Sequence, residues 1–454
     1  MVLRRITGMV LSALLTLCLI TPLYAEQTAD AVAKADFSTY SEAYVVIDAD
    51  TGQVLLEHNM NKREYPASIT KVLTVAIAME RAELSDRLVM SETAVNSVSR
   101  SSTHIALSAD EEITVEDAIM ATHLASANDA ANGLAEYIGG SQEMFCALMN
   151  KTALKAGAVN SNFTNANGLE GDDHYTTAYD MAMITRYALT VKGFREVFGR
   201  VEYKMQPTNK QPEQRNFGTA HHMTVYSYYQ YKGAWGGKLG WTPQANHTAV
   251  TVAERDGKEL ICVVLNSKTK WDKYKDTKKL FDYCFNKLQT VTVTAAVDSA
   301  KTIPVVEDGG VVGVAKLPQQ TVTCRLYVPE GVTEENIDIS YNTQVSYQKG
   351  EEIAPAACFS IMSEGGAQTP VLTLPLTCVV ELDENTQASV LSATEVQANV
   401  NVSGQKTPTT VRWPVIIASV VGGLLLAFLL VRFAVQCYYR KKRAKRRAMS
   451  YYRR

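Results

Sequence analysis

The sequence predicts a mixed α/β fold: an antiparallel sheet flanked by helices, followed by a small all-β domain and one C-terminal transmembrane helix. Pairs of β-rich runs stand before and after a long stretch with helical periodicity. This order differs from the regular strand–helix alternation of dinucleotide-binding folds. A Val- and Thr-rich tract comes next, and an uncharged run of about membrane length lies near the C-terminus.

The first hairpin is predicted at Ala43–Asp48 and Gln53–Glu57, which flank an Asp/Gly turn. The stretch from Ser68 to about Glu83 is apolar nearly all round, which indicates a buried central helix. Further helical patterns cover Val115–Leu124, Ala127–Ile138 and Gln142–Ala156, and another begins at Thr177.

Strand patterns return after Gly233. They are Lys238–Thr242, Thr248–Glu254 and Glu259–Leu265, and helical Trp271–Leu288 follows them. We therefore place a first domain at 38–290. A β-rich domain at 291–383 contains short runs broken by Pro and Gly: Val311–Val314, Gln320–Val328, Ile337–Val345, Val371–Leu374 and Thr377–Leu382.

The two ends of the chain predict its location. Residues 1–25 have the basic start, short apolar core and small final residue of a cleaved signal peptide. Residues 384–412 are polar and read as a stalk, and 413–436 are predicted to span the membrane. The basic tail at 437–454 then lies in the cytoplasm. We expect a single-pass membrane protein whose body lies outside the cell.

Charge and cysteine content narrow the possible functions. All 47 acidic residues lie between Glu26 and Glu395, whereas 12 of the 45 Lys and Arg residues lie at the ends. An acidic body argues against nucleic acid as a partner. The six cysteines from Cys146 to Cys378 are too sparse for a disulfide scaffold, although a bridge within Cys324, Cys358 and Cys378 stays open. No zinc-ligand or phosphate-loop spacing occurs, and we expect no metal or cofactor.

Three short motifs occur in order: Ser68-Ile69-Thr70-Lys71, Ser126-Ala127-Asn128 and Lys238-Leu239-Gly240. Residues three apart share a helix face, so the Lys71 amine can reach the Ser68 hydroxyl. A lysine acts as a base only when neutral, which requires burial or a neighbouring cation such as Lys238. Glycines around Gly240 leave room for a close backbone approach along a cleft.

With their flanks, these motifs resemble the serine-type D-alanyl-D-alanine carboxypeptidases, the low-molecular-weight penicillin-binding proteins. The flanks are Tyr65-Pro66-Ala67, Asn165-Ala166-Asn167-Gly168-Leu169, Thr177-Ala178-Tyr179-Asp180-Met181 and Trp241-Thr242. The motif trio is a known signature of β-lactamases and penicillin-binding proteins. The resemblance implies a β-lactamase/transpeptidase-like fold and a peptidoglycan stem peptide ending in D-Ala-D-Ala as substrate. It also implies β-lactams as covalent inhibitors.

The resemblance also implies a role for each matching residue. Ser68 is the acylated nucleophile, Lys71 its base, and Ser126 a proton relay to the leaving amine. Substrate binding falls to Asn128, Lys238, Gly240, Trp241 and Thr242, with the backbone N–H groups of Ser68 and Trp241 as the oxyanion hole. The family usually has Thr or Ser where Leu239 stands, and that hydroxyl binds the substrate carboxylate. Thr242 is a candidate substitute.

Three other functions remain as alternatives. A D,D-endopeptidase would use the same residues on cross-linked peptides. A non-catalytic ectodomain that binds muropeptides or penicillin is favoured if Leu239 disables turnover. A β-lactamase is disfavoured because the Glu-x-x-Leu-Asn stretch of class A enzymes is absent. We interpret Asp172-Asp173-His174 as a solvated loop, not as a metal site or part of a triad.

Overall fold

The structure is a computed structural model that describes residues 33, 36–169, 171–297, 302–307, 310–342, 344–346, 355–363 and 366–382. The predicted signal peptide, stalk, membrane helix and basic tail lie outside these residues. No helix among the described residues is long and apolar enough to cross a membrane.

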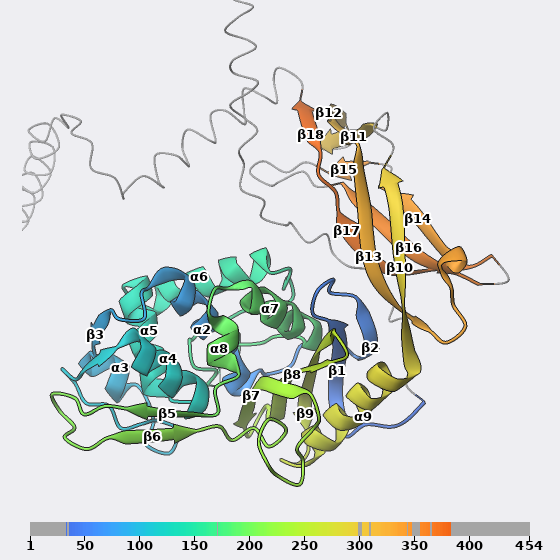
Figure 1. Cartoon of the computed structure of the whole chain (residues 1–454). Helices are drawn as coiled ribbons and strands as arrows, with labels where there is room; N and C mark the ends of the chain where they lie inside the picture. The colour runs from blue at the N-terminus through green and yellow to red at the C-terminus, as the bar shows by residue number, and fades with distance from the viewer. Residues whose placement is uncertain are drawn as a thin grey trace, which may run out of the picture. The chain divides into compact units, whose positions relative to one another are not determined.

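The first region contains a five-stranded antiparallel sheet with strand order β2-β1-β9-β8-β7 (Figure 1). Its strands are β1 (Ser41–Asp48), β2 (Val54–His58), β7 (Ala234–Thr242), β8 (Asn246–Arg255) and β9 (Lys258–Ser267). The predicted antiparallel sheet is therefore confirmed. Strand β7 lies at its edge, so one side of its backbone has no partner strand within this sheet.

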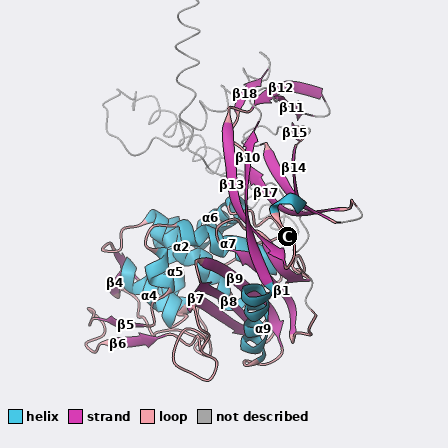
Figure 2. Ribbon diagram, turned by 45° about the vertical axis from the view of Figure 1, so that its right-hand side comes forward, coloured by secondary structure: helices cyan, strands magenta, loops and turns pink. Residues whose placement is uncertain are grey.

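Helices cover both faces of this sheet (Figure 2). Helices α7 (Ala178–Thr190) and α9 (Asp272–Lys287) contact the sheet directly. The other helices of this region are η1 (Ala67–Thr70), α2 (Lys71–Arg81), α3 (Glu92–Asn96), α4 (Val115–Leu124), α5 (Asn128–Gly139), α6 (Gln142–Lys155) and α8 (Phe194–Phe198). The predicted helix from Ser68 to Glu83 is thus a 3₁₀ turn that continues as α2.

Side chains alternate between the two faces, as the pleat of a strand requires. Ile261 and Val263 of β9 belong to the core shared with α2, α4, α5 and α7. Cys262 between them points the other way, where it is in hydrogen-bond contact with Thr277 of α9. Because β9 is buried on both faces, its central run from Leu260 to Leu265 is apolar at every position and does not alternate with polar residues.

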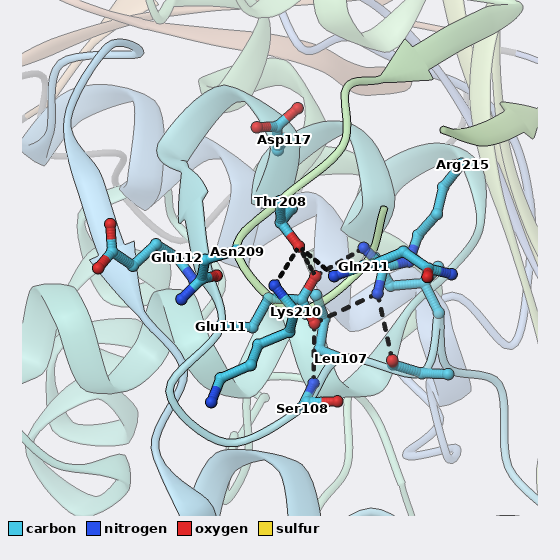
Figure 3. A network of polar contacts seen from close by, with 12 residues as sticks. Leu107, Ser108, Glu111, Glu112, Asp117, Thr208, Asn209, Lys210, Gln211 and Arg215 are labelled. Atoms are coloured by element: carbon cyan, nitrogen blue, oxygen red, sulfur yellow. Dashed lines mark hydrogen bonds and ion pairs between the residues drawn. The ribbon is translucent and has the colours of Figure 1, made fainter. Parts of the chain in front are cut away.

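A hairpin that the sequence analysis did not predict, β5 (Glu202–Met205) and β6 (Arg215–Gly218), lies beside the short pair β3 (Arg87–Val89) and β4 (Glu112–Thr114). Figure 3 shows how the buried carboxylate of Glu111 fixes it. This carboxylate accepts hydrogen bonds from Arg215, Thr208 and the Ser108 N–H. Since Arg215 also donates to Ala106 O, the hairpin is tied to the loop that precedes β4.

The second region is built from strands, as predicted. One sheet is the pair β10-β13, and the other sheets have the orders β15-β11-β12-β18 and β14-β16-β17. The strands are β10 (Leu288–Val297), β11 (Thr302–Glu307), β12 (Gly310–Lys316), β13 (Gln320–Pro329), β14 (Ile337–Tyr341), β15 (Val345–Ser346), β16 (Ala356–Met362), β17 (Gln368–Pro375) and β18 (Val379–Leu382), with the short turn η2 (Glu334–Asn336). Cys324 and Cys358 are free thiols, so no disulfide joins them.

Candidate active site

Ser68 and Lys71 lie together at the start of the central helix. Ser68 is in η1, and Lys71 begins α2. Residues three apart are eclipsed in a 3₁₀ turn, and the Lys71 Nζ lies 2.9 Å from the Ser68 Oγ. Ala67, just before the serine, has a φ of 51°, an uncommon conformation for a residue with a side chain. The serine is therefore presented on a strained turn beside a lysine.

The Lys71 side chain is fully buried, and two further oxygens surround its nitrogen. Nζ donates to Asn128 Oδ1 at 2.7 Å and to the backbone oxygen of Asn167 at 2.5 Å. A neutral amine has two N–H groups and one lone pair. The two oxygens match the two N–H groups, so the lone pair of a neutral Lys71 points at the Ser68 hydroxyl.

Burial lowers the pKa of Lys71 well below its usual value, and the charge of Lys238 lowers it further, while Asp129 acts in the opposite direction. Desolvation is the larger cause because an ammonium without water loses its hydration energy. The charge state that a base requires is therefore favoured by the place of the lysine in the fold.

Ser126 and Lys238 form a second pair across the cleft. The Lys238 Nζ, on β7, donates to Ser126 Oγ at 2.9 Å and to Leu239 O at 3.1 Å. Ser126 has a φ of 55°. The start of α5, which follows it, is fixed by a hydrogen bond from the Asn128 N–H to Thr103 O. Burial lowers the pKa of Lys238 to about 7.

Gly240 allows β7 to lie against the nucleophile. A methyl group added at Gly240 would lie 2.9 Å from Ser68 N and 2.4 Å from Thr248 Oγ1, closer than van der Waals contact permits. The edge of β7 therefore borders the Ser68 turn directly. An extended peptide can pair with such an edge.

A pocket of about 330 Å³ opens over this edge. Its lining includes Ser68, Ser126, Leu239, Gly240 and Trp241. Thr242 is buried and is not part of that lining, and its Oγ1 accepts a hydrogen bond from Ala245 N. The Thr242 hydroxyl, the candidate substitute for the hydroxyl that Leu239 lacks, therefore already accepts a hydrogen bond within a turn and does not line the pocket.

The pocket also contains residues that the sequence analysis missed. Lys273 and Tyr274 of α9, with Trp271 and Lys270 just before it, line the far side. Lys273 is only 4% exposed and donates to Lys270 O. Burial lowers its pKa to about 8, and no ion pair joins it to an acid in the described part of the chain. The sequence gives no indication that this lysine is buried in a pocket wall, because most lysines on an amphipathic helix face solvent.

The sequence analysis gave Asn167 no role of its own beyond its place in a flanking motif, yet its backbone oxygen accepts a hydrogen bond from Lys71. The loop carrying it is packed tightly, because a methyl group at Gly168 would lie 2.0 Å from Ala67 O. No cluster of metal-binding side chains occurs among the described residues. The chemistry that these groups can perform is nucleophilic attack by a serine that a buried lysine deprotonates.

Comparison with known proteins agrees with this chemistry. The profile of the D-alanyl-D-alanine carboxypeptidase family matches residues 28–269. The chain belongs to this family. It is 30% identical over 293 residues to D-alanyl-D-alanine carboxypeptidase DacF of Bacillus subtilis, covering 63% of this chain and 72% of the relative. It is 30% identical over 291 residues to DacC of Escherichia coli, covering 62% and 69% of the two chains.

Solved structures share the fold. The D-alanyl-D-alanine carboxypeptidase DacD of Francisella tularensis has a TM-score of 0.57 at 22% identity, over 79% of this chain and 97% of that one. Penicillin-binding protein 5 of Haemophilus influenzae has the same TM-score and identity, over 76% and 99%. The expected penicillin-binding-protein fold is confirmed, and the chain is a serine-type D-Ala-D-Ala carboxypeptidase of the cell wall.

Proposed function

We propose that Ser68 is the nucleophile and Lys71 its base, and that the enzyme removes the last D-alanine from stem peptides through a Ser68 acyl-enzyme. The observation that carries this proposal is the buried Lys71 amine, 2.9 Å from the Ser68 hydroxyl at the wall of an open pocket. Burial favours the neutral amine, and the neutral amine is the form that accepts a proton.

In the acylation step, Ser68 Oγ attacks the carbonyl carbon of the D-Ala-D-Ala peptide bond while its proton passes to Lys71 Nζ. The negative charge that develops on the carbonyl oxygen is stabilised by the N–H groups of Ser68 and Trp241. The C–N bond then breaks, and the leaving amine takes a proton from Ser126 Oγ, which Lys238 orients from 2.9 Å. The proton that Lys71 took from Ser68 passes on to Ser126, so Lys71 is again neutral and Ser126 again a hydroxyl when the acyl-enzyme has formed. Water hydrolyses the resulting ester and releases the shortened peptide.

Lys273 anchors the terminal carboxylate of the substrate in this proposal. It is the buried cation of the pocket wall formed by α9, and Leu239 has no hydroxyl for that task. A carboxylate brought next to it raises the pKa of Lys273 from about 8, so the lysine is charged when substrate is bound. Asn128 and the backbone of β7 hold the peptide group beside Ser68.

The body of the enzyme lies outside the cell in this proposal, on a single C-terminal membrane helix at 413–436. The support is the signal-peptide pattern at 1–25 and the basic tail at 437–454.

Covalent labelling with fluorescent penicillin tests the nucleophile. We expect the wild type to be labelled and Ser68→Ala to be unlabelled, with Ser340→Ala, in the second region, as a control that labels normally. A labelled Ser68→Ala enzyme would contradict the assignment. Release of D-alanine from a pentapeptide identifies a carboxypeptidase, whereas cleavage of cross-linked muropeptides alone identifies an endopeptidase. Labelling without turnover of either substrate identifies a binding protein.

A further inference from the structure

His174 is buried beside the base, although its neighbours in sequence suggested a solvated loop. The side chain is 1% exposed, and its ring packs edge-on against Phe163 at 5.7 Å between centroids. The solvated-loop interpretation of this residue is therefore wrong. Burial is the main cause that lowers the pKa of His174 to about 4, so the imidazole is neutral at physiological pH.

Both ring nitrogens of His174 have partners, and these partners define its tautomer. The backbone N–H of Thr164 donates to Nδ1 at 3.1 Å. An amide nitrogen cannot accept in return, so Nδ1 carries no proton and Nε2 does. Nε2 lies 3.0 Å from Thr70 Oγ1 and donates to it.

These partners belong to the two segments that hold Lys71. Thr70 immediately precedes Lys71 and lies in the same 3₁₀ turn as Ser68. Thr164 begins the loop whose Asn167 oxygen accepts from Lys71 Nζ. The loop that carries Asn167 and Gly168 packs closely against the turn that carries Thr70, because a methyl group at Gly168 would lie 3.0 Å from Thr70 Oγ1.

We propose that His174 is a positioning residue, which joins the Ser68–Lys71 turn to the Asn167 loop and thereby directs the Lys71 lone pair at Ser68. Asn167 O is one of the two acceptors that orient the neutral amine. If the loop moves away, the amine loses that acceptor and water reaches it. A less desolvated amine has a higher pKa, so less of it is neutral at a given pH. The inference rests on the proposed function of Lys71.

Two substitutions separate the two ring nitrogens. His174→Asn places an amide oxygen near the Nδ1 position and keeps an acceptor for Thr164 N–H, but it has no donor that reaches Thr70. His174→Gln places an amide nitrogen near the Nε2 position and keeps that donor. Thr70→Val removes the hydroxyl with little change of volume. His123→Asn is the matched control, because His123 is also a buried histidine of this region and its ring packs against Phe198 of α8.

The measurement is the rate of acylation by fluorescent penicillin as a function of pH, with thermal unfolding recorded for each variant. We expect His174→Asn and Thr70→Val to shift the acidic limb about one pH unit upward, which reduces the rate on that limb roughly tenfold. His174→Gln should shift it less. His123→Asn should lower the unfolding temperature and leave the limb in place.

Two results would overturn the proposal. One is a pH profile of His174→Asn and Thr70→Val that overlays the wild type while only the unfolding temperature falls, since a purely structural role predicts that. The other is an equal shift in His174→Gln and His174→Asn, which contradicts the donor to Thr70. A wild type that is not acylated at all contradicts the proposed function instead, so the two failures are distinguishable.

Discussion

The two regions of the molecule differ in what they bury. The first region buries lysines, aspartates and histidines, among them Lys71, Asp129, His174 and Lys238. Among the described residues from 288 to 382, Ser360 and the hydroxyl of Tyr327 are buried polar groups, no charged side chain is buried, and most of the core is apolar. Burying a charge is unfavourable unless it is compensated. The first region therefore contains buried ionisable groups that reduce its stability, and several of these groups lie in the candidate active site.

Removing an aromatic ring from the second region should have the largest effect on stability. Phe359 of β16 is fully buried. We expect Phe359→Ala to lower the stability of that region by about 3–5 kcal/mol, because the lost contacts leave a cavity. Thermal unfolding measures the loss. The rate of penicillin labelling should stay unchanged, and a parallel fall in that rate would break the contrast between the two regions.

A matched pair of glycines compares the regions directly. Gly168 and Gly331 both have positive φ angles, 83° and 90°. A methyl group at Gly168 meets Ala67 O, whereas nothing lies within 4 Å of one at Gly331. We expect Gly168→Ala to reduce penicillin acylation about a hundredfold, since the loop and the Ser68 turn must separate. Gly331→Ala should be less stable by about 1–2 kcal/mol from backbone strain alone. Equal acylation by the two variants would show that this close approach is unimportant.

Acid should destabilise the first region more than the second. All seven histidines lie in the first region, and burial lowers the pKa of His174 to about 4 and that of His123 and His221 to about 3. Unfolded histidines take up a proton near pH 6.5. Because the folded state binds fewer protons, stability is lost as the pH falls from about 6.5 towards 4. Calorimetry should show the unfolding temperature of the first region falling by several degrees over this range, while that of the second changes less. The reverse order would contradict the assignment.

The smallest expected effect concerns substrate recognition. Leu239→Thr restores the hydroxyl that the family usually has at this position. A hydrogen bond to a charged group contributes roughly 1.5–3 kcal/mol, so D-alanine release should rise about tenfold without a change in stability. Lys273→Met, the matched variant, should lower release and raise KM. An unchanged rate for Leu239→Thr would show that Lys273 already satisfies the carboxylate.

The sequence predicted elements whose pattern is local. Helix α4 begins and ends where its periodicity does, at Val115 and Leu124, and the β8–β9 hairpin turns at Asp256-Gly257. The β5–β6 hairpin was not predicted from the sequence, because its first strand, Glu202-Tyr203-Lys204-Met205, is short and has no clear apolar alternation. That hairpin is held by the ion pair of Arg215 with Glu111, 104 residues away in sequence.

By itself, the sequence determined the identity and order of the groups proposed to react: a serine and a lysine three residues apart, a second serine, and a lysine two residues before a glycine on a strand. Spacing along one turn is a local property, so it can be read from the chain. Only the tertiary structure decided that the Asn167 oxygen and the His174 ring meet the Ser68 turn, and that Lys273 is buried in the pocket wall. Those contacts join segments roughly a hundred or more residues apart, and such contacts form only when the core is packed.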